Sequence, residues 1–214
     1  MVRLFLLLSL FLAACTGASG LNLGYYPDPD ATRSHFNLCH GYGCTHQTET
    51  GFTDKEWKKI KKIFRAKSKT PEAERQKIAK AIALMERYTG ERVGTKVDLP
   101  KAPIKKSSEM ELDCIDETIN TTKYLTFLQD DGLLKFHSVG NPVYKGMFIN
   151  GVYPHNSASV RENESGDIYV IDSYIYKNGE EPNIRPLDNW VKYRVEDLEK
   201  IHNETRAAAE NIKR

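Results

Sequence analysis

After its first dozen residues the sequence has no long apolar run, and it has no excess of charge of either sign. Because no further apolar run could span a membrane, we expect a tethered soluble domain. The formal net charge of +2 excludes the broad basic surface of a nucleic-acid-binding protein, and the basic stretch 58–69 is predicted to be a solvated helix face. Repeats and low-complexity segments are also missing. Without a leader, about 200 residues remain, enough for one domain with its own core.

Residues 1–14 have the features of a signal peptide. Arg3 precedes an apolar run at 4–12 that is too short to span a bilayer. The run ends in Leu12-Ala-Ala-Cys15, which resembles the lipobox of bacterial lipoproteins and implies cleavage before Cys15 and diacylation of Cys15. Thr16 follows, which by analogy favours the outer membrane. The resemblance therefore implies a lipid-anchored bacterial envelope protein facing the periplasm; an ordinary signal peptide, with the cysteine incidental, is the alternative.

Residues 15–50 are predicted to form a tether and a disulfide-pinned loop. Cys39 and Cys44 flank a segment with two glycines that lets the chain turn back, and in an oxidising envelope they most simply pair with each other. Zinc is the alternative, because cysteine and histidine are its usual ligands and this segment also holds His35, His40 and His46. The spacing fits no common zinc framework, so no metal is predicted.

Residues 51–214 are predicted to form a single domain, with helical patterns first and strand patterns second. Capping signals at Thr53 and Thr70-Pro71 start two helices, the second of which ends at Gly90, and a third helix runs from Cys114 to about residue 129. Strands are predicted at 133–139, 143–152, 155–160 and 167–176, followed by an irregular wrap at 182–190 and a closing helix at 195–212. This order indicates an α+β fold, in which the N-terminal helices and the Cys114 helix pack on an antiparallel sheet.

Cys114 is the residue with the strongest chemical signal. It follows Asp113, a good N-cap, so its thiol is predicted to lie at the positive end of a helix dipole, where the thiolate is favoured. With the other cysteines explained, it is an unpaired thiol in an exported protein, which favours a functional role over inert packing. His155 and Asp172 lie on neighbouring predicted strands, where a base and the carboxylate that orients it can meet.

The segments Asp113-Cys114, Pro154–Val160 and Ile168–Ser173 together resemble the catalytic core of the transglutaminase-like superfamily, over residues 109–190. The resemblance implies a papain-like triad with Cys114 as nucleophile, His155 as base and Asp172 as orienting carboxylate. It implies acyl transfer from a peptide or isopeptide amide, without a cofactor, to water or to an amine.

The sequence departs from the family pattern at two places. Asn156-Ser157-Ala158 follows the histidine where many members have tryptophan, and Ser173 follows the aspartate where proline is frequent. These departures leave the substrate open. The second oxyanion donor and the oligomeric state also stay open, and the alternative function is a non-catalytic binding or scaffold lipoprotein of the same fold.

Several other residues have simpler interpretations. His137 alternates with apolar residues and is predicted to face solvent from a strand. Asp116 and Glu117 suit the first turn of a helix for dipole reasons alone. Trp190, after two prolines, is predicted to be a packing residue that could also screen the triad from water.

Overall fold

The structure is a computed structural model that describes residues 28–101, 109–146, 154–194 and 197. The predicted signal peptide at 1–14, the lipid attachment at Cys15 and nearly all of the closing helix lie outside these residues. Within them, no helix combines the length and the apolar character needed to cross a bilayer.

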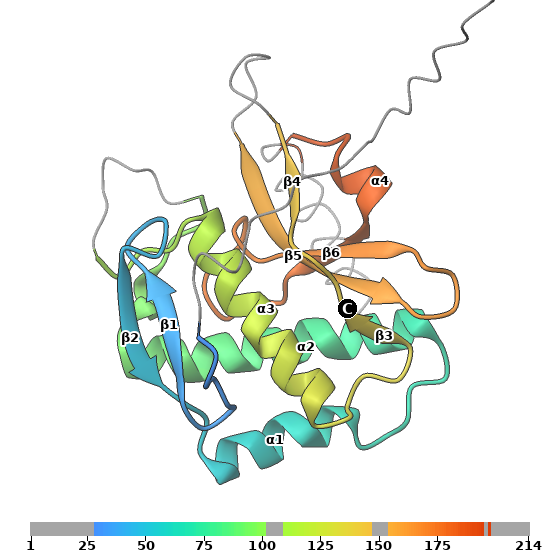
Figure 1. Cartoon of the computed structure of the whole chain (residues 1–214), viewed down its shortest axis with the longest axis horizontal. Helices are drawn as coiled ribbons and strands as arrows, with labels where there is room; N and C mark the ends of the chain where they lie inside the picture. The colour runs from blue at the N-terminus through green and yellow to red at the C-terminus, as the bar shows by residue number, and fades with distance from the viewer. Residues whose placement is uncertain (1–27, 102–108, 147–153, 195–196, 198–214) are drawn as a thin grey trace, which may run out of the picture.

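Helices and strands follow the predicted α+β order (Figure 1). The hairpin strands are β1 (Phe36–His40) and β2 (His46–Thr50). The helices are α1 (Asp54–Phe64), α2 (Pro71–Val93), the short 3₁₀ helix η2 (Thr95–Val97), α3 (Cys114–Asp130) and α4 (Leu187–Trp190). The sheet strands are β3 (His137–Val139), β4 (Val143–Lys145), β5 (His155–Glu162), β6 (Ile168–Asp172) and β7 (Asn183–Pro186).

Local capping explains where α1 and α2 begin. The Thr53 hydroxyl accepts from the Glu56 N–H, and the Glu56 carboxylate accepts from the Thr53 N–H, a reciprocal capping box. Thr70 caps α2, whose first residue is Pro71. The prediction for the end of α2 was wrong: the helix continues through Gly90 and ends at Gly94, which adopts φ +108°. The absence of a side chain at Gly90 instead admits the Asn178 side chain.

The main sheet is antiparallel, in the order β3-β5-β6-β7, with β4 also paired to β5. β3 pairs with the end of β5, and β4 pairs with its beginning. The register of β5 and β6 places Ala158 opposite Ile171. β7 occupies part of the segment that was predicted to be an irregular wrap. It lies at the edge of the sheet, where its flanking prolines disturb no central ladder.

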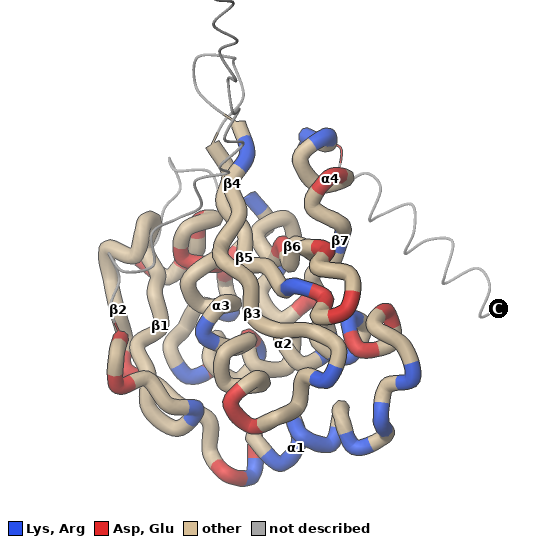
Figure 2. The backbone as a smooth tube through the Cα atoms, turned by 45° about the vertical axis from the view of Figure 1, so that its right-hand side comes forward, with Lys and Arg blue, Asp and Glu red and all other residues tan. Residues whose placement is uncertain are grey.

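Helix α3 lies between the main sheet and the β1–β2 hairpin (Figures 1 and 2). One buried cluster runs through this layer and includes Phe36 and Leu38 of the hairpin, Ile82 of α2, Leu125 of α3 and Val160 of β5. Residues 36–50, expected to be part of a tether and loop, therefore form a hairpin that shares the core of the domain. α3 is held from both sides.

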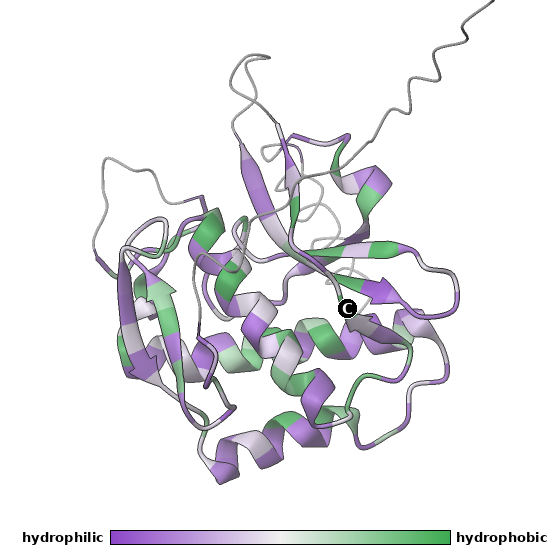
Figure 3. Cartoon of the chain, in the orientation of Figure 1, coloured by the Kyte–Doolittle hydropathy of each residue, from purple (hydrophilic) through white to green (hydrophobic). Residues whose placement is uncertain are grey.

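Charged residues gather along α1 at the bottom of the molecule (Figure 2), and hydrophilic residues predominate on this helix (Figure 3). Lys58, Lys61, Lys62 and Arg65 line a shallow groove there with Phe64 and Leu133. Leu133 follows the C-terminal end of α3, so this groove is about 25 Å from Cys114, the length of a 17-residue helix. The lysines and Arg65 are exposed, as a solvated helix face requires.

Candidate active site

Cys114 is the first residue of α3 and its thiol is half-buried. Asp113 is the N-cap, and its Oδ1 accepts from the N–H groups of Ile115 (3.0 Å) and Asp116 (2.9 Å). Asp116 Oδ2 accepts in return from the Asp113 N–H at 3.1 Å. This capping box fixes the first turn of α3 around the thiol, because the residues before and after Cys114, Asp113 and Ile115, both take part in its hydrogen bonds.

His155 and Asp172 meet on one face of the sheet. Continuing the β5–β6 register places Asp172 opposite Ser157, so His155, two residues before Ser157, projects from the same face. His155 Nε2 lies 2.9 Å from Asp172 Oδ2, and both residues are buried. The two strands alone are enough to assemble this pair.

The Cys114 side chain lies beside the histidine and contributes to the shift of its pKa. Because Asp172 takes Nε2, the nitrogen left for the thiol is Nδ1. Burial by itself would lower the pKa of His155, but the charge and hydrogen bond of Asp172, with the contact to Cys114, raise it to about 9. His155 is therefore an imidazolium at neutral pH, and a cation beside a thiol stabilises the thiolate.

Trp190 completes the buried chain of contacts, a role that the sequence did not reveal. Its indole Nε1 donates to Asp172 Oδ2 at 2.7 Å, and its ring lies 5.5 Å from the His155 ring, centroid to centroid. Burial raises the pKa of Asp172, but His155, the indole N–H and Lys145 outweigh it and hold that pKa below its ordinary value. Asp172 therefore stays ionised in an apolar surrounding.

Lys145 of β4 holds Trp190 in place. Its ammonium lies 4.1 Å from the centre of the indole ring and donates to the Trp190 carbonyl oxygen at 3.0 Å. No local spacing links residues 145, 172 and 190, so only their assembly in the fold could have identified this group.

Tyr174 lies beside the histidine, with ring centroids 5.3 Å apart. Burial, and then the charges of Cys114 and Asp113, raise the pKa of its phenol. The hydroxyl therefore stays protonated next to the thiol and is available as a hydrogen-bond donor.

His137 does not belong to this group, and the prediction that it faces solvent was wrong. Its side chain is buried, with Nδ1 3.0 Å from Glu74 Oε1 and Nε2 3.1 Å from Arg75 Nη1. It pairs with Glu162 at the far end of β5 from His155, about 24 Å along the strand. This cluster fastens α2 to the sheet.

Asp116 and Glu117 are buried, so their role is not limited to the helix dipole. Burial and the nearby Asp113 raise the pKa of Asp116 to about 7. Burial and neighbouring carboxylates also raise the pKa of Glu117, and the pKa of Asp98 rises to about 8. These carboxylates repel one another when ionised in the interior beside α3, and each therefore holds its proton to a higher pH.

The predicted disulfide between Cys39 and Cys44 is present and closes the turn between β1 and β2. His40 bonds to the Glu109 carbonyl oxygen and the Thr48 hydroxyl, while His35 faces Glu49. Within the part of the chain that the structure describes, no three metal-ligating side chains converge on a common point.

Comparisons of the chain with protein-family models, with curated proteins and with solved structures found no match. The case for an active site therefore depends on the geometry of the chain itself.

Proposed function

We propose that this protein is a cysteine-dependent acyl hydrolase or acyltransferase, of transglutaminase-like type, that acts on peptide or isopeptide amide bonds. The observation that carries the proposal is the buried series His155, Asp172 and Trp190, joined by hydrogen bonds, with the half-buried Cys114 beside His155. Inert packing does not require an ion pair in the interior, because burying two charges costs free energy.

The arrangement supports the following mechanism. The Cys114 thiolate attacks the amide carbonyl carbon, and the C–N bond breaks as the His155 imidazolium gives its proton to the departing amine. Water or a second amine then attacks the thioester, His155 takes the proton from this acceptor, and the thiolate leaves. Asp172 holds the imidazole orientation and stabilises its cation throughout.

Two groups are candidates for stabilising the oxyanion. The Cys114 N–H, at the start of α3, has no hydrogen-bond partner among the residues that the structure describes. The Tyr174 hydroxyl is the second candidate, because it stays protonated close to the thiol. Preorganised donors of this kind stabilise charge that develops in the transition state.

The lipobox-like Leu12-Ala-Ala-Cys15 supports a place for this enzyme on the bacterial envelope, held by a lipid on Cys15. Incorporation of a labelled fatty acid, lost in a Cys15→Ser variant, is the test of this part of the proposal. Incorporation that persists in the variant would refute it.

Labelling by electrophilic peptide probes tests the chemistry. The peptide that contains Cys114 should be modified in the wild-type chain, with loss of labelling in Cys114→Ala and a decrease of at least tenfold in His155→Asn and Asp172→Asn. His35→Asn is the matched control, because this exposed histidine also faces a carboxylate, that of Glu49. Labelling that His155→Asn leaves unchanged would favour the non-catalytic scaffold.

A further inference from the structure

The turn between β1 and β2 has an unusual backbone. Gly41, Tyr42, Gly43 and Cys44 have φ values of +79°, +67°, +65° and +58°, so four consecutive residues are left-handed and two of them are not glycine. Side-chain-bearing residues rarely adopt this conformation, and it persists only where the surroundings hold it. The Cys39–Cys44 disulfide closes the turn.

Three consecutive N–H groups of the turn donate to carboxylates at the start of α3. Tyr42 donates to Asp116 Oδ2 at 2.9 Å and Cys44 to Asp116 Oδ1 at 2.6 Å, while Gly43 donates to Asp113 Oδ2 at 3.0 Å. Successive N–H groups in such a turn form a concavity that binds anions. Here the acceptors are the carboxyl groups of the two aspartates of the capping box around the candidate nucleophile.

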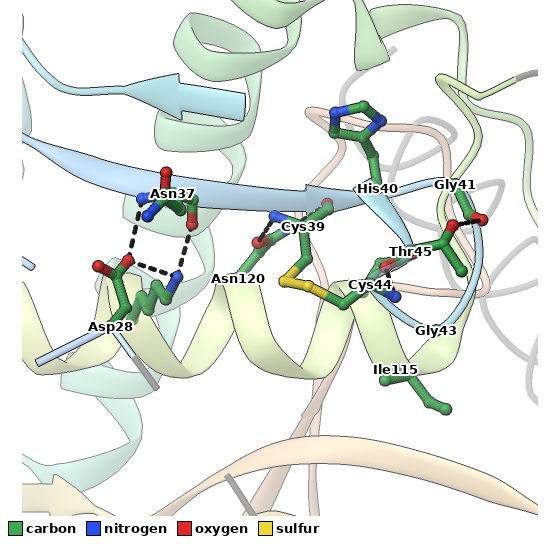
Figure 4. The surroundings of a disulfide bond; sticks show 12 residues. Asp28, Asn37, Cys39, His40, Gly41, Gly43, Cys44, Thr45, Ile115 and Asn120 are labelled. Carbon is green, nitrogen blue, oxygen red and sulfur yellow. Dashed lines mark hydrogen bonds and ion pairs between the residues drawn. A yellow bond between two sulfur atoms is a disulfide. The ribbon is translucent and has the colours of Figure 1, made fainter. Parts of the chain in front are cut away.

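The disulfide itself lies against α3 (Figure 4). The Asn120 side chain accepts from the Cys39 N–H at 2.9 Å and donates to the Cys39 carbonyl oxygen at 2.8 Å. Cys39 and Cys44 pack on Ile119, with Ile115 at the edge of the contact. The turn is therefore attached to the first two turns of α3 by polar and apolar contacts together.

We propose that the turn 39–44, closed by its disulfide, is a positioning element for the Cys114 thiol. Asp113 immediately precedes Cys114 and Asp116 lies two residues after it, and negative charge near a thiol opposes formation of the thiolate. The three N–H groups of the turn offset this charge and hold the first turn of α3 at a fixed position relative to His155. The inference rests on the proposed function, since it gives the disulfide a role in the reactivity of that nucleophile.

Other titratable groups also act on this end of α3, and they belong to several elements. They are His155 on β5, Asp172 on β6, Tyr174 after it, Tyr42 in the turn, and Asp98, Glu111, Asp113, Asp116 and Glu117 along the approach to α3 and its first turn. A variant that tests the turn must therefore leave every one of these charges in place.

The Cys39→Ser/Cys44→Ser double variant meets this condition. Its alkylation by iodoacetamide is measured in the full chain from about pH 5 to pH 9, by mass spectrometry of the peptide that contains Cys114. We expect the rate at pH 7 to fall about tenfold and the half-maximal pH to rise by about one unit, because the thiolate is the reactive form. A role in global stability alone would lower the melting temperature without moving the pH profile.

Asn120→Leu provides a second variant in which the disulfide is kept but its hydrogen bonds to α3 are lost. We expect a rate decrease of about threefold in the same direction. Thr126→Ala is the control on the same helix, because among the described residues its hydroxyl donates only to the Thr122 carbonyl oxygen, away from the turn.

The outcomes separate the two proposals. Folded variants that alkylate like the wild type, with the same pH profile, would overturn the positioning role. If the wild-type thiol reacts no faster than a cysteine in an unstructured peptide, the proposed function fails first. If it reacts faster, and only the turn variants lose that advantage, both are supported.

Discussion

Replacing Trp190 by phenylalanine tests the buried series of hydrogen-bonded side chains at the residue whose role the sequence did not reveal. The variant keeps an aromatic ring beside His155 but removes the indole N–H that donates to Asp172 Oδ2 at 2.7 Å. Asp172 is 3 % exposed, and its Oδ1 has no hydrogen-bond partner among the described residues, so His155 would be its one remaining side-chain donor. Water cannot easily replace the lost bond.

The expected magnitude follows from the charge on the acceptor. A hydrogen bond to a buried ionised group contributes about 1.5–3 kcal/mol, so unfolding in urea should show a loss of about 2 kcal/mol. Without this bond the Asp172 carboxylate is free to rotate away from His155, which weakens the charge interaction and the hydrogen bond that raise the pKa of His155 to about 9. Since about 1.4 kcal/mol corresponds to a factor of ten, alkylation of Cys114 near pH 7 should slow by about tenfold.

Trp57 offers a control with matching chemistry. Its indole donates to Asp131 Oδ2 at the same distance of 2.7 Å, and its ring is also buried, but Asp131 lies at the opposite end of α3 from Cys114. Trp57→Phe should therefore lower stability and leave alkylation of Cys114 unchanged. Equal alkylation rates in Trp190→Phe and Trp57→Phe would refute the reasoning.

Three further predictions concern other parts of the structure. The melting temperature should fall as pH rises from about 5 to about 8. The pKa values of Asp98 and Asp116 are about 8 and 7 in the folded chain against 3.8 for the unfolded reference, so in this range the folded chain holds protons that the unfolded chain has already lost, and each rise in pH favours unfolding. A melting temperature that rises over this range in calorimetry would contradict the prediction. Glu74→Ala should lower the free energy of unfolding in urea by about 3 kcal/mol, because the Glu74 carboxylate accepts from three consecutive backbone N–H groups and a buried histidine. Glu72 is exposed, so Glu72→Ala should change that free energy by less than about 0.5 kcal/mol. Equal losses in the two variants would contradict the structural role given to Glu74. Tyr174→Phe should lower the rate of amide turnover by about a hundredfold if the hydroxyl binds the oxyanion. The rate of iodoacetamide alkylation should stay unchanged, because that reaction forms no oxyanion. Wild-type turnover in the variant would exclude Tyr174 as an oxyanion donor.

Features that depend on neighbours in the chain were predictable. The capping box at Thr53 and the N-cap at Asp113 involve residues at most three positions apart, and the Cys39–Cys44 disulfide joins residues five positions apart. The pattern of helices followed by strands was enough for the α+β class, and it also placed His155 and Asp172 on adjacent strands.

Errors arose where a distant segment decides the surroundings of a residue. The alternation around His137 indicated an exposed face, but α2 covers that face and supplies Glu74 as a partner 63 residues away. Asp116 suited a helix start by position, yet the hairpin turn buries it and provides two of its donors. β7 escaped prediction because prolines at its borders suggested irregular structure, which an edge strand tolerates.

The sequence by itself determined which residue begins α3, which cysteines pair and which thiol stays free. These outcomes follow from contacts that form within a few residues, where chain connectivity already brings the groups together. Only the tertiary structure decided what surrounds that thiol: the indole on Asp172, the hairpin turn on Asp113 and Asp116, and the burial of carboxylates beside α3. Burial and charge at Cys114 depend on packing between segments 18 to about 75 residues apart, and no local pattern encodes them.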